Sequence, residues 1–238
     1  MKFRIGFIVA ASLISQIGFA GEHEVDPRIF STDAFLGAHP DLRWRLRGLE
    51  KYQKGEYDEA FKDFRRAARY ADKPAQAMVA EMLWKGEGTK SDRALAYAWM
   101  DLAAEREYPT LAVFREQYWA QLTPEEQKQA LEIGKAVYAE YRDSVAKPRL
   151  ESQLRNARSD ITGSRTGMTG GLKIYLPSPT GELFIEGREF FDPRFWDPKQ
   201  YWQWASKGWT ELPKARVTVG PLTAEPAADP KKKETEKK

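Results

Sequence analysis

The sequence predicts a mainly α-helical protein, an α/α superhelical solenoid followed by a small aromatic-rich C-terminal region that contains β-strands. Three observations lead to this fold class. Apolar residues recur at helical spacing through residues 41–143, two helix pairs in that stretch share a spacing of small residues, and eight aromatic side chains lie within residues 190–209. A chain of 238 residues is long enough to bury such a core.

The composition excludes several classes of chemistry. The chain has no cysteine, which excludes disulfides, thiolate nucleophiles, Cys-ligated zinc and a lipid-anchored cysteine. Its two histidines, His23 and His39, lie near the N-terminus, which argues against a histidine triad or a His-rich metal cage. Lys and Arg number 38 against 35 Asp and Glu, so there is no basic field for nucleic acid. We therefore expect no metal, no cofactor and no nucleic-acid partner.

The first twenty residues have the three-part pattern of a secretory signal peptide. A cationic start with Lys2 and Arg4 precedes an apolar run over 5–14, and Gly18 and Ala20 are small. The run is too short to span a bilayer. We predict cleavage after Ala20 and a soluble periplasmic or secreted protein that is not a lipoprotein and has no membrane span. The alternative is a buried N-terminal helix.

Residues 21–40 are expected to form an extended N-terminal segment, and the repeats begin after it. At the other end, residues 224–238 contain no large apolar side chain, which predicts a disordered charged tail. An alternative role for this tail is weak electrostatic attachment to anionic surface polymers.

Six helices are expected in the repeat region, residues 41–143. Gly55 and Gly86 end the first and third helices, Asp92 is a candidate N-cap for the fourth, and Thr123-Pro124-Glu125-Glu126 is a capping box for the sixth. The apolar stripes that define the helices run over Leu42–Tyr52, Tyr57–Ala68, Pro74–Trp84, Leu95–Ala103, Leu111–Trp119 and Ala130–Tyr141.

Two of the helix pairs resemble each other. Ala60, Ala67 and Ala68 recur at an offset of 36 as Ala96, Ala103 and Ala104, and small residues at such positions let two helices approach closely. The stretch 75–112 resembles a Sel1-like repeat of the tetratricopeptide superfamily. The residues that carry the resemblance are the G-x-G turn at Gly86 and Gly88, then Asp92, Trp99 and the alanine pair Ala103 and Ala104. The stretch departs from the family at Arg106 and Glu107, where glycine is usual.

The resemblance implies an α/α superhelical scaffold that binds proteins or peptides, often in exported bacterial assemblies. The groove of such a scaffold would be built from the first helix of each hairpin. Candidates for exposure there are Arg47, Lys51, Met78, Glu81 and Arg115. The periodicity does not fix the helical faces well enough to assign contacts.

The second half of the chain is expected to start with a connecting helix over residues 144–160, followed by a C-terminal module over 161–223. The glycine-rich stretch 162–171 lacks a phosphate-loop motif and is interpreted as a flexible connector, with a ligand loop as the alternative. Residues 172–176 and 182–186 predict a β-hairpin, and 215–219 a third strand.

The aromatic cluster of residues 190–209 has two interpretations. It covers the small sheet, or it forms a stacking platform for sugar rings or a peptide through Trp196, Trp202, Trp204 and Trp209. An enzyme is a third possibility. A glycoside hydrolase would need two carboxyl groups beside a cleft, for which the local candidates are Glu182, Glu186, Glu189, Asp192 and Asp197, but no motif accompanies them.

The sequence therefore predicts an exported, non-catalytic scaffold for protein–protein or peptide interactions, with an unidentified exported or envelope protein as its partner. The alternative is a cell-wall protein that binds glycan, such as peptidoglycan, through the C-terminal Trp and Phe side chains.

Overall fold

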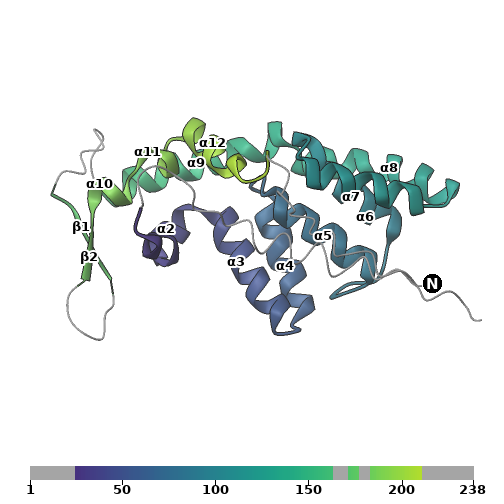
Figure 1. Cartoon of the computed structure of the whole chain (residues 1–238), viewed down its shortest axis with the longest axis horizontal. Helices are drawn as coiled ribbons and strands as arrows, with labels where there is room; N and C mark the ends of the chain where they lie inside the picture. Colours follow the sequence, from purple (N-terminus) through teal and green to yellow (C-terminus); the bar gives the residue numbers. More distant parts are fainter. Residues whose placement is uncertain (1–24, 163–170, 177–182, 211–238) are drawn as a thin grey trace, which may run out of the picture.

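The computed structural model describes residues 25–162, 171–176 and 183–210, which are mainly helical with one two-stranded sheet (Figure 1). The predicted signal peptide, third strand and charged tail lie outside these residues, as does most of the glycine-rich connector. The elements are η1 (Pro27–Ser31), α2 (Asp33–Ala38), α3 (Pro40–Gln53), α4 (Tyr57–Ala68), α5 (Lys73–Lys85), α6 (Arg93–Ala103), η2 (Ala104–Arg106), α7 (Pro109–Gln121), α8 (Pro124–Tyr141), α9 (Asp143–Thr162), β1 (Lys173–Leu176), β2 (Leu183–Glu186), α10 (Gly187–Phe190), α11 (Pro193–Trp196) and α12 (Pro198–Lys207).

The six helices expected between residues 41 and 143 are all present, as α3 to α8. Consecutive helices pack together from α3 to α6, and α7 and α8 both pack against α6. The last two helices therefore share α6 as a common support.

The predicted helix starts have the caps that their sequences indicate. The Asp92 side chain accepts a hydrogen bond from the backbone N–H of Leu95, 2.9 Å away. At the start of α8, Thr123 accepts from the N–H of Glu126, while the Glu126 carboxylate accepts from the N–H of Thr123. These bonds satisfy N–H groups that have no partner inside the helix.

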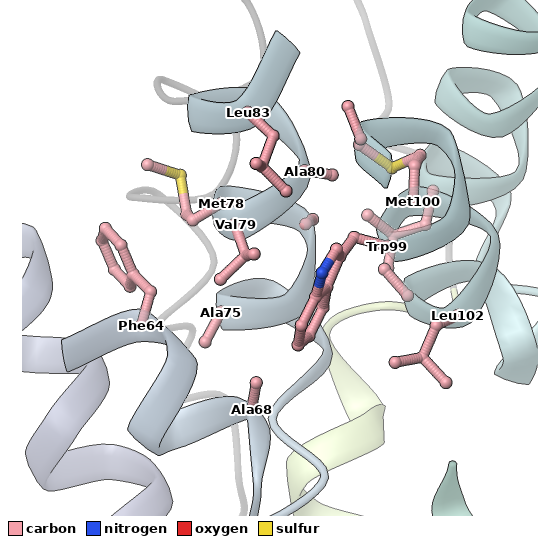
Figure 2. Close-up of a cluster of buried hydrophobic side chains, with 14 of the residues drawn as sticks. Phe64, Ala68, Ala75, Met78, Val79, Ala80, Leu83, Trp99, Met100 and Leu102 are labelled. Atoms are coloured by element: carbon pink, nitrogen blue, oxygen red, sulfur yellow. The ribbon is translucent and has the colours of Figure 1, made fainter. Parts of the chain in front are cut away.

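The alanines of the repeat lie in the main core. The six that recur at the offset of 36 are fully buried, so the helices approach closely at these positions. Figure 2 shows α5 between Phe64 of α4 and Trp99 of α6, with Ala75 and Val79 pointing into the core. Every residue from Lys73 to Leu83 is buried, which makes α5 the central helix of the array.

A second core joins the two ends of the described chain. The side chains of Ile29, Phe35 and Ala38 pack against those of α10 and α11 and against Ile185 of β2. Residues 25–40 are therefore not an extended segment, because η1 and α2 form there and bury their apolar side chains against residues about 150 positions further along the chain. The repeat region and the C-terminal region also share packing across the predicted boundary, because Leu42 belongs to the second core and Trp209 to the main core.

The predicted β-hairpin is present at one end of the elongated molecule, with α6, α7 and α8 toward the other end (Figure 1). Strands β1 and β2 are antiparallel, with Tyr175 opposite Phe184 and Ile174 opposite Ile185. Ile185 faces the second core, while Tyr175 and Phe184 are 60% and 42% exposed. The alternation of the strand places one face of the hairpin on the core and the other in solvent.

Candidate functional site

Two of the four tryptophans of the predicted stacking platform are core residues. Trp196 in α11 is 1% exposed, and its indole Nε1 donates to the carbonyl oxygen of Phe190 at 2.6 Å. Trp209 is 8% exposed and lies nearly parallel to Tyr108, with ring centroids 6.1 Å apart. Neither indole presents a face to a ligand, so the structure places this half of the platform inside the protein.

The other two tryptophans, on α12, are partly exposed but their rings are engaged within the chain. Trp204 stacks parallel to Phe30 with centroids 6.0 Å apart. Trp202 lies beneath two cations, with the Arg106 guanidinium 5.1 Å and the Lys147 ammonium 5.3 Å from its centroid, and its Nε1 donates to Glu151. The four tryptophans thus do not share one surface. In the described residues, Phe190, Phe195 and Trp204 of the aromatic cluster contact Phe30 or Phe35 of the N-terminal segment.

The exposed aromatic side chains of the C-terminal region are instead Tyr175 and Phe184 of the β-hairpin. Their ring centroids are 6.4 Å apart and their planes are inclined by 56°. The Lys173 ammonium lies 4.2 Å from the Phe184 centroid. Because the two rings are not coplanar, they do not form a flat platform of the kind on which a sugar ring stacks.

The carboxylates considered for catalysis have structural partners. Asp192 and Asp197 accept hydrogen bonds from backbone N–H groups at the starts of α11 and α12. Glu189 accepts from the N–H of Asp26, and Glu186 pairs with Arg188. Asp192 and Asp197 thus cap helix starts, Glu189 contacts the N-terminal segment, and Glu186 forms a surface ion pair. Glu182 lies outside the described residues.

Helix α5, the first helix of the second hairpin (α5 and α6), does not line a groove. Met78 and Glu81, which were candidates for exposure, are 1% and 2% exposed, because α5 is enclosed by its neighbours. The Glu81 carboxylate accepts a hydrogen bond from the Tyr118 hydroxyl at 2.6 Å and pairs with Lys85 at 2.7 Å. The prediction of exposure was wrong for these two residues because a helix with neighbours on all sides can have the same apolar period as one at a surface.

A buried polar junction connects α3, α5 and α12. The Tyr201 hydroxyl donates to the Asp41 carboxylate, and Arg45 donates to Asp72 at 2.8 Å. Burial raises the pKa of Asp72 to about 6, although the Arg45 charge opposes this shift. Burial also raises the pKa of Asp41 and of Tyr201. Because these side chains bind one another, the junction has a structural role.

A second charged cluster fixes the start of α9. Lys73 is 1% exposed and its ammonium lies 2.7 Å from Glu105 and 3.1 Å from Asp143. Arg106 donates to both carboxylate oxygens of Asp143, at 2.7 and 3.0 Å. Burial alone would raise the pKa of Asp143, but Arg106 and Lys73 outweigh it and hold that pKa well below its ordinary value. Arg106 is thus an anchor for the following helix.

A different surface combines aromatic, charged and concave features on the first hairpin, which is formed by α3 and α4. The side chain of Trp44 in α3 is surrounded by three guanidinium groups, those of Arg43, Arg47 and Arg66, whose carbons lie 4.8, 5.0 and 4.6 Å from its ring centroid. We call these four residues the Trp44 patch. Arg66 reaches it from α4, while Arg43 and Arg47 lie one helical turn apart on α3.

A hollow of about 550 Å³ adjoins the Trp44 patch between α2 and α3. Arg43 and Arg47 belong to both the patch and the hollow. The residues that line the hollow are Asp33, Leu36, Arg43, Leu46, Arg47 and Glu50. Its wall therefore offers two leucines for apolar contact and charges of both signs, a mixture suited to a peptide segment.

The sequence contains a signal for this surface that is separate from the apolar periodicity. Arg43, Arg45 and Arg47 alternate with Trp44 and Leu46 in the first predicted helix. An Arg at each of two positions four apart places both on one face of a helix, beside the intervening tryptophan. The contribution of Arg66 from the next helix was not visible from spacing alone.

No family model, curated protein or solved structure matches this chain. The resemblance to Sel1-like repeats therefore rests on the residues of the stretch 75–112. In the part of the chain that the structure describes, no helix is long and apolar enough to cross a membrane. The same residues contain no group of three or more His, Asp or Glu side chains that could hold a metal ion.

Proposed function

We propose that this protein is an exported, non-catalytic scaffold of the α/α superhelical kind, and that it binds a segment of another exported or envelope protein. The observation that carries the proposal is the hollow beside Trp44, which remains open on the first hairpin, while α5 in the next hairpin is buried from Lys73 to Leu83. Consecutive helix packing through buried alanines and the Sel1-like stretch support the superhelical arrangement.

Export enters the proposal through the pattern of residues 1–20. The mature chain would begin at Gly21 and act in the periplasm or outside the cell. The intact mass of the protein isolated from its native host measures this directly. A mass that still includes residues 1–20 contradicts export by cleavage after Ala20.

The glycan alternative has less support after the tryptophans are located. Its four proposed residues, Trp196, Trp202, Trp204 and Trp209, are buried or have their rings engaged within the chain. Peptidoglycan binding remains a separate outcome that the same experiment can measure.

The test is capture of exported proteins on the immobilised mature chain. Two variants place the same new charge on two helices: Leu46→Asp in the hollow, and Leu131→Asp on α8, where the side chain is 59% exposed. A protein partner that uses the hollow is retained by the wild type and Leu131→Asp but lost with Leu46→Asp. Circular dichroism of both variants confirms that they are folded.

A second arm of this experiment uses sedimentation with insoluble peptidoglycan. If peptidoglycan sediments the protein while no exported protein is enriched on the bait, the scaffold proposal is wrong and the glycan alternative replaces it.

A further inference from the structure

The positive charge around Trp44 exceeds the acidic groups that pair with it. Residues 41–70 contain nine Lys and Arg against six Asp and Glu, and two of these cations, Arg45 and Arg69, are paired with Asp72 and Glu140 outside the segment. The excess is concentrated around Trp44 and the adjoining buried carboxylate of Asp63.

Asp63 is fully buried and has three cations around it. Its Oδ1 accepts from Arg66 at 2.8 Å, while its Oδ2 lies 3.1 Å from the Lys51 ammonium and 3.6 Å from Arg47 Nε. Lys51 also lies 3.4 Å from Glu59, which pairs in turn with Lys62. Two carboxylates thus face four cations, so this group retains a positive excess. Arg47 and Arg66 are each half exposed, which leaves their remaining N–H donors accessible.

Arg43 adds a further charge on the same face. It makes no ion pair with any residue in the described ranges, and its Nε is buried without a hydrogen-bond partner. The Arg43 guanidinium carbon lies 4.8 Å from the Trp44 ring centroid. An indole ring attracts the cation but accepts no charge-assisted hydrogen bond, so a carboxylate would pair with the terminal N–H groups of Arg43 and not with the buried Nε. Arg43 and Arg47 both border the hollow, so these donors lie at its wall.

From these observations we propose that the Trp44 patch and the adjoining hollow bind an acidic segment of the partner protein, with Asp or Glu carboxylates paired to Arg43 and Arg47 and apolar side chains against Leu36 and Leu46. This inference rests on the proposed scaffold function and specifies the partner's chemistry. Arginine suits this task because its planar fork donates two parallel hydrogen bonds to one carboxylate. Asp33 and Glu50 at the same hollow would repel a uniformly acidic chain, which favours a segment whose carboxylates are spaced by apolar residues.

The test uses a fluorescein-labelled octapeptide with glutamate at alternating positions and alanine or leucine between, and a second peptide with glutamine in place of glutamate. Binding to the full chain is followed by fluorescence anisotropy at low and at roughly physiological ionic strength. The variant Arg43→Gln/Arg47→Gln is compared with Lys135→Gln/Arg188→Gln, which removes the same charge at side chains that are 72% and 83% exposed and far from the patch in sequence.

The affinity for the glutamate peptide should fall about tenfold or more in Arg43→Gln/Arg47→Gln, since the loss of one hydrogen bond to a charged group is enough for a tenfold change. In the control variant it should fall by less than about twofold. The glutamine peptide should bind the wild type as weakly as the glutamate peptide binds the double variant. Thermal melts of both variants report whether the fold is retained.

Equal affinity for the two peptides, or equal losses in the two variants, overturns the inference. Tighter binding of phosphatidylglycerol vesicles or of an anionic polysaccharide than of the glutamate peptide, with the same dependence on Arg43 and Arg47, overturns it in favour of an anionic surface. The remaining outcome is a protein partner that the wild-type chain captures and Leu46→Asp does not retain. If excess glutamate peptide does not displace that partner, the scaffold function stands and only the proposal of an acidic segment is contradicted.

Discussion

Replacing Gly88 by alanine should test how the turn of residues 86–92 packs against the first hairpin. Gly88 has φ +65°, and a Cβ added there would lie 2.3 Å from the backbone carbonyl atoms of Tyr57 and 2.7 Å from the backbone nitrogen of Asp58. Both neighbours are main-chain atoms at the start of α4, so no side-chain rotation relieves the contact. The turn has to move away from α4 to accommodate the methyl group.

The magnitude follows from two contributions. An alanine in the left-handed region costs about 1–2 kcal/mol, and forcing a methyl group into packed surroundings adds about 1–3 kcal/mol. Gly55 provides a matched control, because its φ is +79° but nothing lies within 4 Å of an added Cβ. Gly55→Ala should therefore lose only the first contribution, and Gly88→Ala should be less stable than Gly55→Ala by about 1–3 kcal/mol.

The assay is urea unfolding of the full chain, followed by far-UV circular dichroism, with thermal melts in parallel. The extra loss corresponds to a melting temperature lower by about 2–4 °C per kcal/mol for a chain of this length. If the two variants unfold at the same urea concentration, the turn does not pack against α4 and the described contact between neighbouring hairpins is wrong.

Three further predictions concern packing and protonation. Gly48→Ala should lower the free energy of unfolding by about 1–2 kcal/mol in urea titrations, because a Cβ there would lie 2.7 Å from the buried Phe64 ring. Gly134→Ala, whose nearest contact is at 3.9 Å, should raise it by roughly 0.5–1 kcal/mol. Equal effects of the two substitutions would contradict the close approach of α3 and α4. Burial lowers the pKa of His39 from 6.5 to about 4, so the unfolded chain takes up a proton at a higher pH than the folded chain. The stability advantage of the wild type over His39→Gln should therefore shrink by about 3 kcal/mol as the pH falls from 6.5 to 4. A constant difference across that range would show that His39 is not held neutral. Tyr201→Phe should lower the free energy of unfolding by about 1–3 kcal/mol in the same assay, since the buried Asp41 carboxylate loses the hydrogen bond from the Tyr201 hydroxyl. An unchanged unfolding midpoint would show that this hydrogen bond does not stabilise the fold.

The helices of the repeat region could be predicted because their signals are local. Asp92 and the Thr123 capping box mark helix starts by residues three apart in sequence, and the structure forms the corresponding hydrogen bonds. The alanine spacing likewise reports which positions must be small where helices approach.

The N-terminal segment could not be predicted in the same way. Helix α2 has only six residues, too few to be stable without tertiary contacts. Its partners are Phe190 and Phe195, with His39 also contacting the carbonyl oxygen of Phe195 across 156 positions. No local pattern encodes a contact over that distance, so an extended segment was the natural expectation.

The aromatic residues show the limit of composition as a guide to binding. Eight aromatic side chains in residues 190–209 were compatible with a core or a platform, because the count does not say which ring faces solvent. The outcome depends on the residues that reach each ring from elsewhere, such as Phe30 on Trp204 and Arg106 on Trp202. The surface around Trp44 was missed for the same reason, since one of its three arginines comes from another helix.

The central claim is that the first hairpin binds the protein partner. Hydrogen–deuterium exchange of the full chain, alone and saturated with a captured exported protein, measures this most directly. We expect partner-dependent protection in α3 over residues 43–50 and in the facing part of α4 around Arg66, with exchange in β1 and β2 unchanged. Protection confined to the β-hairpin or to α12, with α3 exchanging as in the free protein, would contradict the claim.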